Sequence, residues 1–97
     1  MKGYELSVEA LADLQEIWAY IAQDNPDAAD KLESDIYNAC ELLAKNPRIG
    51  HKRADLTDAP VLFWPGRGHY LIIYQRATQP LKVVRVLHAR RDAMGEV

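Results

Sequence analysis

Several features of secreted and membrane proteins are missing from this sequence of 97 residues. Its one cysteine, Cys40, cannot form an intrachain disulfide, which is typical of proteins from a reducing compartment. No stretch approaches the roughly 18 apolar residues of a membrane-spanning helix, and residues 1–5 hold no apolar run of the kind found in signal peptides. We therefore expect one domain, residues 1–97, that is cytoplasmic and has no membrane partner.

The residue patterns of metal centres and phosphate-binding loops are also missing. The three histidines stand apart from one another, with no cysteine or histidine at ligand spacing. Gly66 and Gly68 make too short a pattern for a glycine loop that cradles phosphates. Cys40 falls in the apolar stripe of a predicted helix, which favours packing over nucleophilic chemistry. We expect no metal site and no cofactor.

Charge is divided unevenly along the chain, although the formal net charge is only −2. Residues 1–46 hold three lysines and no arginine against ten acidic residues, a balance of −7. Residues 47–97 hold nine lysines and arginines against four acidic residues, a balance of +5. Unless these charges only solvate one face, the C-terminal half presents a basic surface that attracts an acidic partner or a phosphate backbone.

The first half of the chain has the apolar spacing of two helices. A short alternation at 4–6 predicts a strand, and Ser7 then caps a helix over about 8–24. Asn25–Pro26 ends this helix and begins the next, and Asn46–Pro47 ends the second one. The short link between the two helices predicts an antiparallel hairpin.

After Gly50 the pattern changes to that of strands. Residues 51–56 are a weak strand candidate, whereas 61–64, 69–75 and 81–87 are rich in β-branched and aromatic residues. The sequence therefore predicts an α+β fold: an N-terminal strand, an antiparallel helical hairpin, and a three- to four-stranded antiparallel sheet with the hairpin on one face.

Arg85 interrupts the apolar strand predicted over 81–87. Strict alternation puts it on the same side as Val83 and Leu87, opposite Val84 and Val86. If the second pair faces the helices, Arg85 points from a free sheet face that is both apolar and basic. Such a face suits a partner with hydrophobic anchors and acidic residues. The alternative is an ion pair between Arg85 and a local carboxylate.

Four segments together carry a resemblance to a known family. They are, in order, YELSVEALADLQEIWAYIAQDNPDAADKLESDI, LAKNPRIGHKRADL, HYLIIYQ and LKVVRVLHARRD. Their order and spacing resemble the RelE/ParE superfamily of toxins from type II toxin–antitoxin systems. The resemblance implies the fold predicted above and a hetero-oligomer with a cognate antitoxin. The C-terminal segment of such an antitoxin wraps across the toxin, and its acidic, flexible character matches a basic sheet face.

The superfamily has two branches with different activities. RelE-like members are endonucleases that cleave messenger RNA on the ribosome, where basic residues activate the ribose 2′-hydroxyl and stabilise the phosphate transition state. ParE-like members are binding poisons that target DNA gyrase and block replication. They are not hydrolases in their own right.

Two departures from the nuclease pattern favour the ParE-like branch. RelE-like nucleases commonly carry an arginine inside the strand that corresponds to HYLIIY, where Leu71 stands here. They also tend to end with a catalytic tyrosine or histidine–tyrosine element, whereas the last aromatic residues here are Tyr70 and Tyr74. The opening LS-x-x-A-x-x-DL and the ending VLHARRD are similar to the ParE branch. We expect a gyrase inhibitor rather than an enzyme.

The resemblance also defines two sets of site residues. In the RelE-like alternative, with the ribosome and messenger RNA as partners, the catalytic set is Arg53, Arg67, Arg85 and His88. His88 would carry protons there, or else make only a structural hydrogen bond. The predicted antitoxin-binding set is Arg67, Tyr70, Arg76, Val83, Arg85, Leu87 and Arg90.

Overall fold

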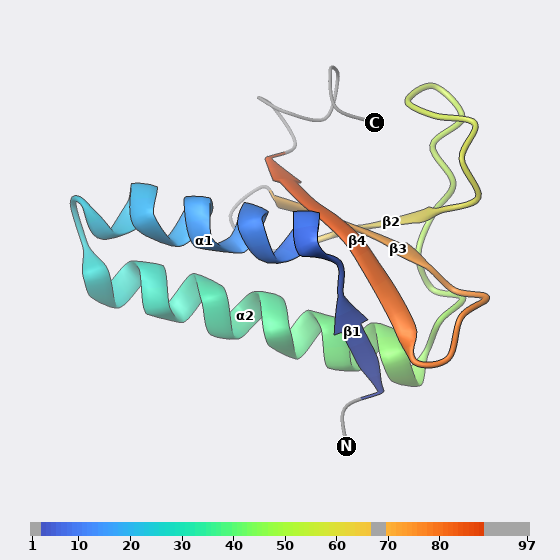
Figure 1. The fold of residues 1–97 in the computed structure, drawn as a ribbon, viewed down its shortest axis with the longest axis horizontal. Coiled ribbons are helices and arrows are strands. Elements are labelled where there is room, and N and C mark those ends of the chain that lie inside the picture. Colours follow the sequence, from blue (N-terminus) through green and yellow to red (C-terminus); the bar gives the residue numbers. More distant parts are fainter. Residues whose placement is uncertain (1–2, 67–69, 89–97) are drawn as a thin grey trace.

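The computed structural model describes residues 3–66 and 70–88, which fold into two helices and four strands. In chain order these are β1 (Tyr4–Leu6), α1 (Val8–Ala22), α2 (Pro26–Lys45), β2 (Leu62–Pro65), β3 (Tyr70–Gln75) and β4 (Leu81–His88). The helices lie side by side as a hairpin, and the strands form one sheet next to them (Figure 1). The predicted α+β class is confirmed.

Both helices begin where their capping residues predict. The Ser7 hydroxyl accepts a hydrogen bond from the Ala10 N–H at 2.9 Å, and the Asn25 side chain accepts one from the Ala28 N–H at 3.1 Å. The Ser7 hydroxyl also donates to the Val84 carbonyl at 2.7 Å, so the same side chain caps α1 and attaches it to β4. Helix α1 ends two residues earlier than predicted.

The sheet has the strand order β1-β4-β3-β2 and is mixed rather than antiparallel. Strands β2, β3 and β4 are antiparallel neighbours, as predicted, but β1 pairs parallel with β4. In the sequence, the helical hairpin lies between β1 and the other three strands. This long connection allows β4 to run beside β1 in the same direction. The weak strand expected over 51–56 was wrong. Only His51 pairs there, in a single bridge with Phe63.

The main core lies between the helical hairpin and one face of the sheet. It is built from the apolar stripes of both helices and from alternate residues of the strands. Its largest fully enclosed members are Tyr74, Ile36 and Leu43. Near the loop that joins the two helices, the Trp18 indole N–H on α1 donates a hydrogen bond to Asp30 on α2 at 2.8 Å.

A smaller apolar cluster covers the other face of the sheet. It is built from residues of all three antiparallel strands and of the segment before β2, namely Val61, Phe63, Leu71, Ile73 and Leu87. Leu56 and Val84 pack against it. Because these five side chains are at most 8% exposed, this face is not the open apolar surface that strict alternation predicted.

A β-bulge explains the error on β4. Ile73 pairs with Arg85 but Tyr74 pairs with Val83, which leaves Val84 as an extra residue without a cross-strand partner. Val83 and Val86 therefore both lie in the main core, whereas Val84 and Leu87 face the second cluster. The prediction that placed Val83 on a free face beside Arg85 was wrong, because one inserted residue reverses the alternation.

Cys40 is fully enclosed in the main core, where burial raises the pKa of its thiol to about 12. We expect iodoacetamide to modify the native chain at pH 8 about a hundredfold more slowly than the urea-unfolded chain, because the thiolate is scarce and shielded. Mass spectrometry of time points measures both rates, and similar rates would contradict the enclosure.

The same pKa sets a dependence of stability on pH. The pKa of the Cys40 thiol is higher in the folded chain than in the unfolded chain. The stability that the buried thiol contributes is therefore fully present below about pH 9 and is lost as pH rises toward 12. The free energy of unfolding is therefore expected to fall across this window. In Cys40→Ala the fall should be shallower by up to about 1.4 kcal/mol per pH unit.

Candidate functional site: a basic pocket beside strands β2 and β3

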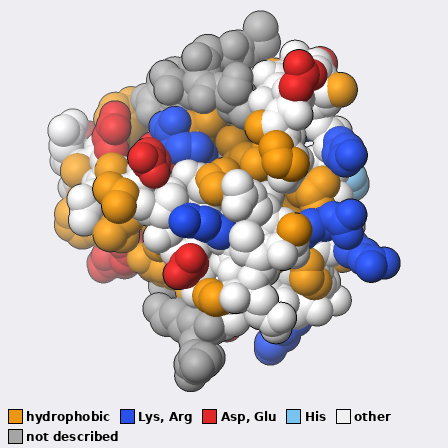
Figure 2. All heavy atoms as spheres, turned by 45° about the vertical axis from the view of Figure 1, so that its right-hand side comes forward, with side chains coloured by type: hydrophobic (Ala, Val, Ile, Leu, Met, Phe, Trp, Pro, Cys, Tyr) orange, Lys and Arg blue, Asp and Glu red, His pale blue; other side chains and the backbone are white. Residues whose placement is uncertain are grey.

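Basic side chains gather around a pocket of about 470 Å³ at the end of β3. Its lining residues come from the segment after α2, from β2 and from the turn after β3, and are Arg48, Gly50, Lys52, Leu62 and Arg76. On the face shown in Figure 2, several lysine and arginine side chains lie along the right edge, and others lie beside acidic side chains left of the centre. The pocket lining contains three cations and no acid.

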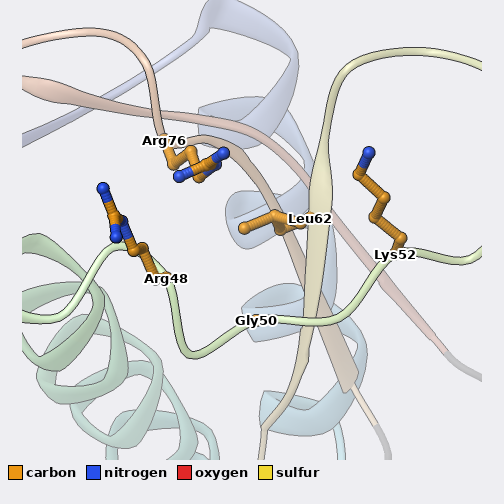
Figure 3. Close-up of a pocket in the computed structure, with 5 residues that line it drawn as sticks. All are labelled: Arg48, Gly50, Lys52, Leu62 and Arg76. Carbon is orange, nitrogen blue, oxygen red and sulfur yellow. The ribbon is translucent and has the colours of Figure 1, made fainter.

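The two arginines converge from different parts of the chain. Figure 3 shows Arg48 and Arg76 extending into the same space, with the Leu62 side chain directed toward it. Lys52 lies on the other side of β2 in that view. A second hollow of about 390 Å³ shares Arg48 and Arg76 and adds apolar surface from Pro47 and Ile49. Arg48 and Arg76 therefore line both hollows.

Tyr74 fixes the segment that carries Arg48. Its hydroxyl donates to the Pro47 carbonyl at 2.8 Å and accepts from the Gly50 N–H at 2.9 Å, so Arg48 stands between two anchored residues. Burial raises the pKa of Tyr74, opposed by the Gly50 hydrogen bond and by the charge of Arg76. Tyr74 lies two residues before Arg76, so the strand that leads to Arg76 also anchors the backbone on both sides of Arg48.

Gly50 lies too close to Tyr74 to carry a side chain. A methyl group there would stand 2.5 Å from the Tyr74 hydroxyl oxygen and 3.0 Å from Leu62 Cβ. Gly50→Ala is expected to lower the free energy of unfolding by about 1–3 kcal/mol in urea titrations. The loss should shrink when Tyr74→Phe removes the clashing oxygen, and a double-mutant cycle without such coupling would contradict this account.

Arg85 does not join the basic pocket. Its Nε and Nη2 atoms donate to the two carboxylate oxygens of Asp13 on α1, at 2.8 and 2.9 Å. Asp13 also accepts the Val86 N–H at 3.0 Å. Since β1 pairs only with residues 81–83 of β4, the Asp13 carboxylate covers the next part of that strand edge. Between the two interpretations of Arg85, the structure shows the ion pair.

Three of the four residues of the nuclease alternative lie among the described residues: Arg53, Arg85 and His88. Arg53 lies in the segment before β2 and forms an ion pair with Asp55 at 3.0 Å, a contact that lowers the pKa of Asp55. His88 packs edge-on against Tyr70, with ring centroids 5.1 Å apart. Arg67 lies outside the described residues. Arg53 and Arg85 are thus each bound to a different carboxylate.

Apart from Arg85, which is bound to Asp13, the predicted antitoxin-binding residues fall into three groups. Arg76 is exposed and lines the basic pocket. Tyr70, Val83 and Leu87 are at most 7% exposed, so they offer little contact surface in this structure. Arg67 and Arg90 lie outside the described residues. Arg48 and Lys52 also line this pocket, but the sequence showed them only as two of the cations in the basic C-terminal half. Their proximity to Arg76 depends on the Tyr74 contacts, which the sequence does not reveal.

Two features are absent from residues 3–66 and 70–88. No three His, Cys, Asp or Glu side chains gather in a group that would hold a metal ion. Neither helix is long and apolar enough to cross a membrane.

Comparison with known proteins agrees with this architecture. Among solved structures, the fold is similar to that of the "Chromosomal ParDE TA system from P. aeruginosa", with a TM-score of 0.71 over 91% of this chain and 96% of that one. At 20% identity, this is a likeness of fold. The protein named "Putative toxin Y4kP" from Sinorhizobium fredii is 32% identical over 94% of this chain and 92% of its own length.

The class defined by this fold is thus that of a small α+β domain. Residues 4–93 match the family described as the ParE toxin of the type II toxin-antitoxin system parDE. The chain belongs to this ParE toxin family, which confirms the resemblance carried by the four sequence segments.

Proposed function

We propose that this protein is a toxin that inhibits DNA gyrase in the cytoplasm by binding, and that a cognate protein antitoxin neutralises it. Membership of the ParE toxin family supports a toxin of a type II system. The choice of a binding poison over an RNA-cleaving enzyme rests on one observation, the burial of Leu71.

Leu71 stands where RelE-like nucleases commonly carry an arginine. It is 7% exposed and belongs to the second apolar cluster, opposite Leu87 on β4 and Pro65 on β2. This position packs the sheet and presents no cation to a phosphate. Removal of one donor that stabilises a transition state costs about 10²–10³ in rate. The ion pair between Arg85 and Asp13 points the same way, because this carboxylate competes with a phosphate for the guanidinium.

The test is a comparison of two assays on one preparation of the full chain. We expect the protein to inhibit gyrase supercoiling or to trap gyrase-cleaved DNA. We expect no cleavage of messenger RNA on translating ribosomes. Addition of the cognate antitoxin should restore supercoiling. Unaffected gyrase together with ribosome-dependent cleavage would overturn the proposal in favour of the RelE-like alternative.

A further inference from the structure

The basic pocket has the chemistry of a carboxylate site. We propose that it docks an acidic segment of the neutralising protein partner, with Arg48 and Arg76 holding the carboxylates of that segment. The inference rests on the proposed function for the existence of such a partner. It adds the place on this chain where the acidic segment binds and the residues that bind it.

The arginines of this pocket have free hydrogen-bonding capacity. Among the described residues, neither Arg48 nor Arg76 forms an ion pair, in contrast to Arg53 with Asp55 and Arg85 with Asp13. A guanidinium group presents a planar fork of donors that matches a carboxylate in two-point geometry. Two such forks that face one hollow leave it strongly positive, and an acidic side chain is the complement.

The pocket is also held in place before any partner arrives. Tyr74 is fully buried and anchors both sides of Arg48 through its hydroxyl group. Arg76 follows Tyr74 by two residues, directly after the end of β3. A binding site that is already ordered loses less conformational entropy when it binds, so each contact contributes more to affinity.

The apolar part of the lining favours a peptide over a nucleic acid. Leu62 lines the pocket beside the arginines, and Pro47 and Ile49 line the adjoining hollow. A peptide that alternates acidic and apolar side chains fills both kinds of surface. A single-stranded nucleic acid offers phosphates for the arginines but also stacks its bases on aromatic side chains, and the described lining of both hollows contains none.

The test uses the ¹⁵N-labelled full chain and a defined probe. The probe is the synthetic peptide acetyl-Leu-Glu-Asp-Leu-Glu-Asp-Leu-amide, with its Gln/Asn counterpart as the uncharged control. At low salt, amide shifts are expected to move at Arg48, Gly50 and Arg76 and to stay constant along α1. Binding should weaken as salt screens the charges. The uncharged peptide should produce no such shifts.

Variants then test the named residues. Arg48→Gln and Arg76→Gln are each expected to weaken binding of the acidic peptide about tenfold. Tyr74→Phe keeps the ring but frees the Arg48 segment, and is expected to weaken it about threefold to tenfold. Arg53→Gln removes the same charge from an arginine already bound to Asp55, and should change affinity less than twofold.

Three results would overturn this docking site. They are shifts confined to other regions, no binding of the acidic peptide at millimolar concentration, and preferential binding of a single-stranded oligonucleotide at the same arginines. The gyrase assay is independent of all three. Gyrase inhibition without peptide binding removes the docking site alone, whereas peptide binding through Arg48 and Arg76 without gyrase inhibition removes only the proposed target.

Discussion

Replacement of Asp13 by alanine is expected to lower the free energy of unfolding by about 2–4 kcal/mol. The Asp13 side chain is only 14% exposed and holds three hydrogen bonds, two from Arg85 and one from the Val86 N–H. The substitution leaves the Arg85 guanidinium without its carboxylate and the Val86 N–H without its acceptor. Urea unfolding followed by circular dichroism measures the change.

Two further variants separate charge from hydrogen bonding. Asp13→Asn keeps an acceptor for the Val86 N–H and should cost less than Asp13→Ala. Glu16→Ala removes the same charge from an exposed position of α1, and its effect should stay within about 0.5 kcal/mol. If Asp13→Ala behaves like Glu16→Ala, the edge of β4 does not depend on this carboxylate.

Local features of this fold could be predicted because their causes are local. Ser7 and Asn25 cap helices through a backbone N–H three residues further on. The apolar spacing that follows each cap shows which helix faces are buried. The strands over 61–64, 69–75 and 81–87 agree with β2, β3 and β4 to within one residue at each end. Composition and periodicity were sufficient for these elements.

The remaining features depend on contacts between distant residues. The bulge at Val84 is not visible in LKVVRVLH, whose alternation fits a regular strand equally well. Arg85 and Asp13 are 72 residues apart, and nothing in either segment identifies the other as its partner. The basic pocket depends on Tyr74 reaching Pro47 across 27 residues, so the sequence showed the charges of the site but not their convergence.

Replacement of Leu71 by arginine tests the feature that separates the two branches of the superfamily. The new cation would stand in the second apolar cluster, against Leu87 and close to Phe63 and Ile73. We expect a loss of roughly 3 kcal/mol or more in the free energy of unfolding, since burial of a charge without a partner is costly. Leu42→Arg makes the same change at a leucine that is 43% exposed on α2, and should cost under about 1 kcal/mol.

The same variant has a functional expectation. If this protein acts by binding, an arginine at position 71 gives no cleavage of messenger RNA on ribosomes, because Arg85 remains bound to Asp13 and Arg53 to Asp55. Leu71→Ala provides the packing-only reference at about 2–5 kcal/mol and shows whether the fold tolerates a loss of this size. Ribosome-dependent cleavage gained by Leu71→Arg would contradict the binding-poison proposal, since it would mean that a nuclease site needs only this one residue. If Leu71→Arg is as stable as the unaltered chain, Leu71 is not enclosed in the second apolar cluster. The argument that position 71 holds a packing residue in place of a catalytic cation would then fail as well.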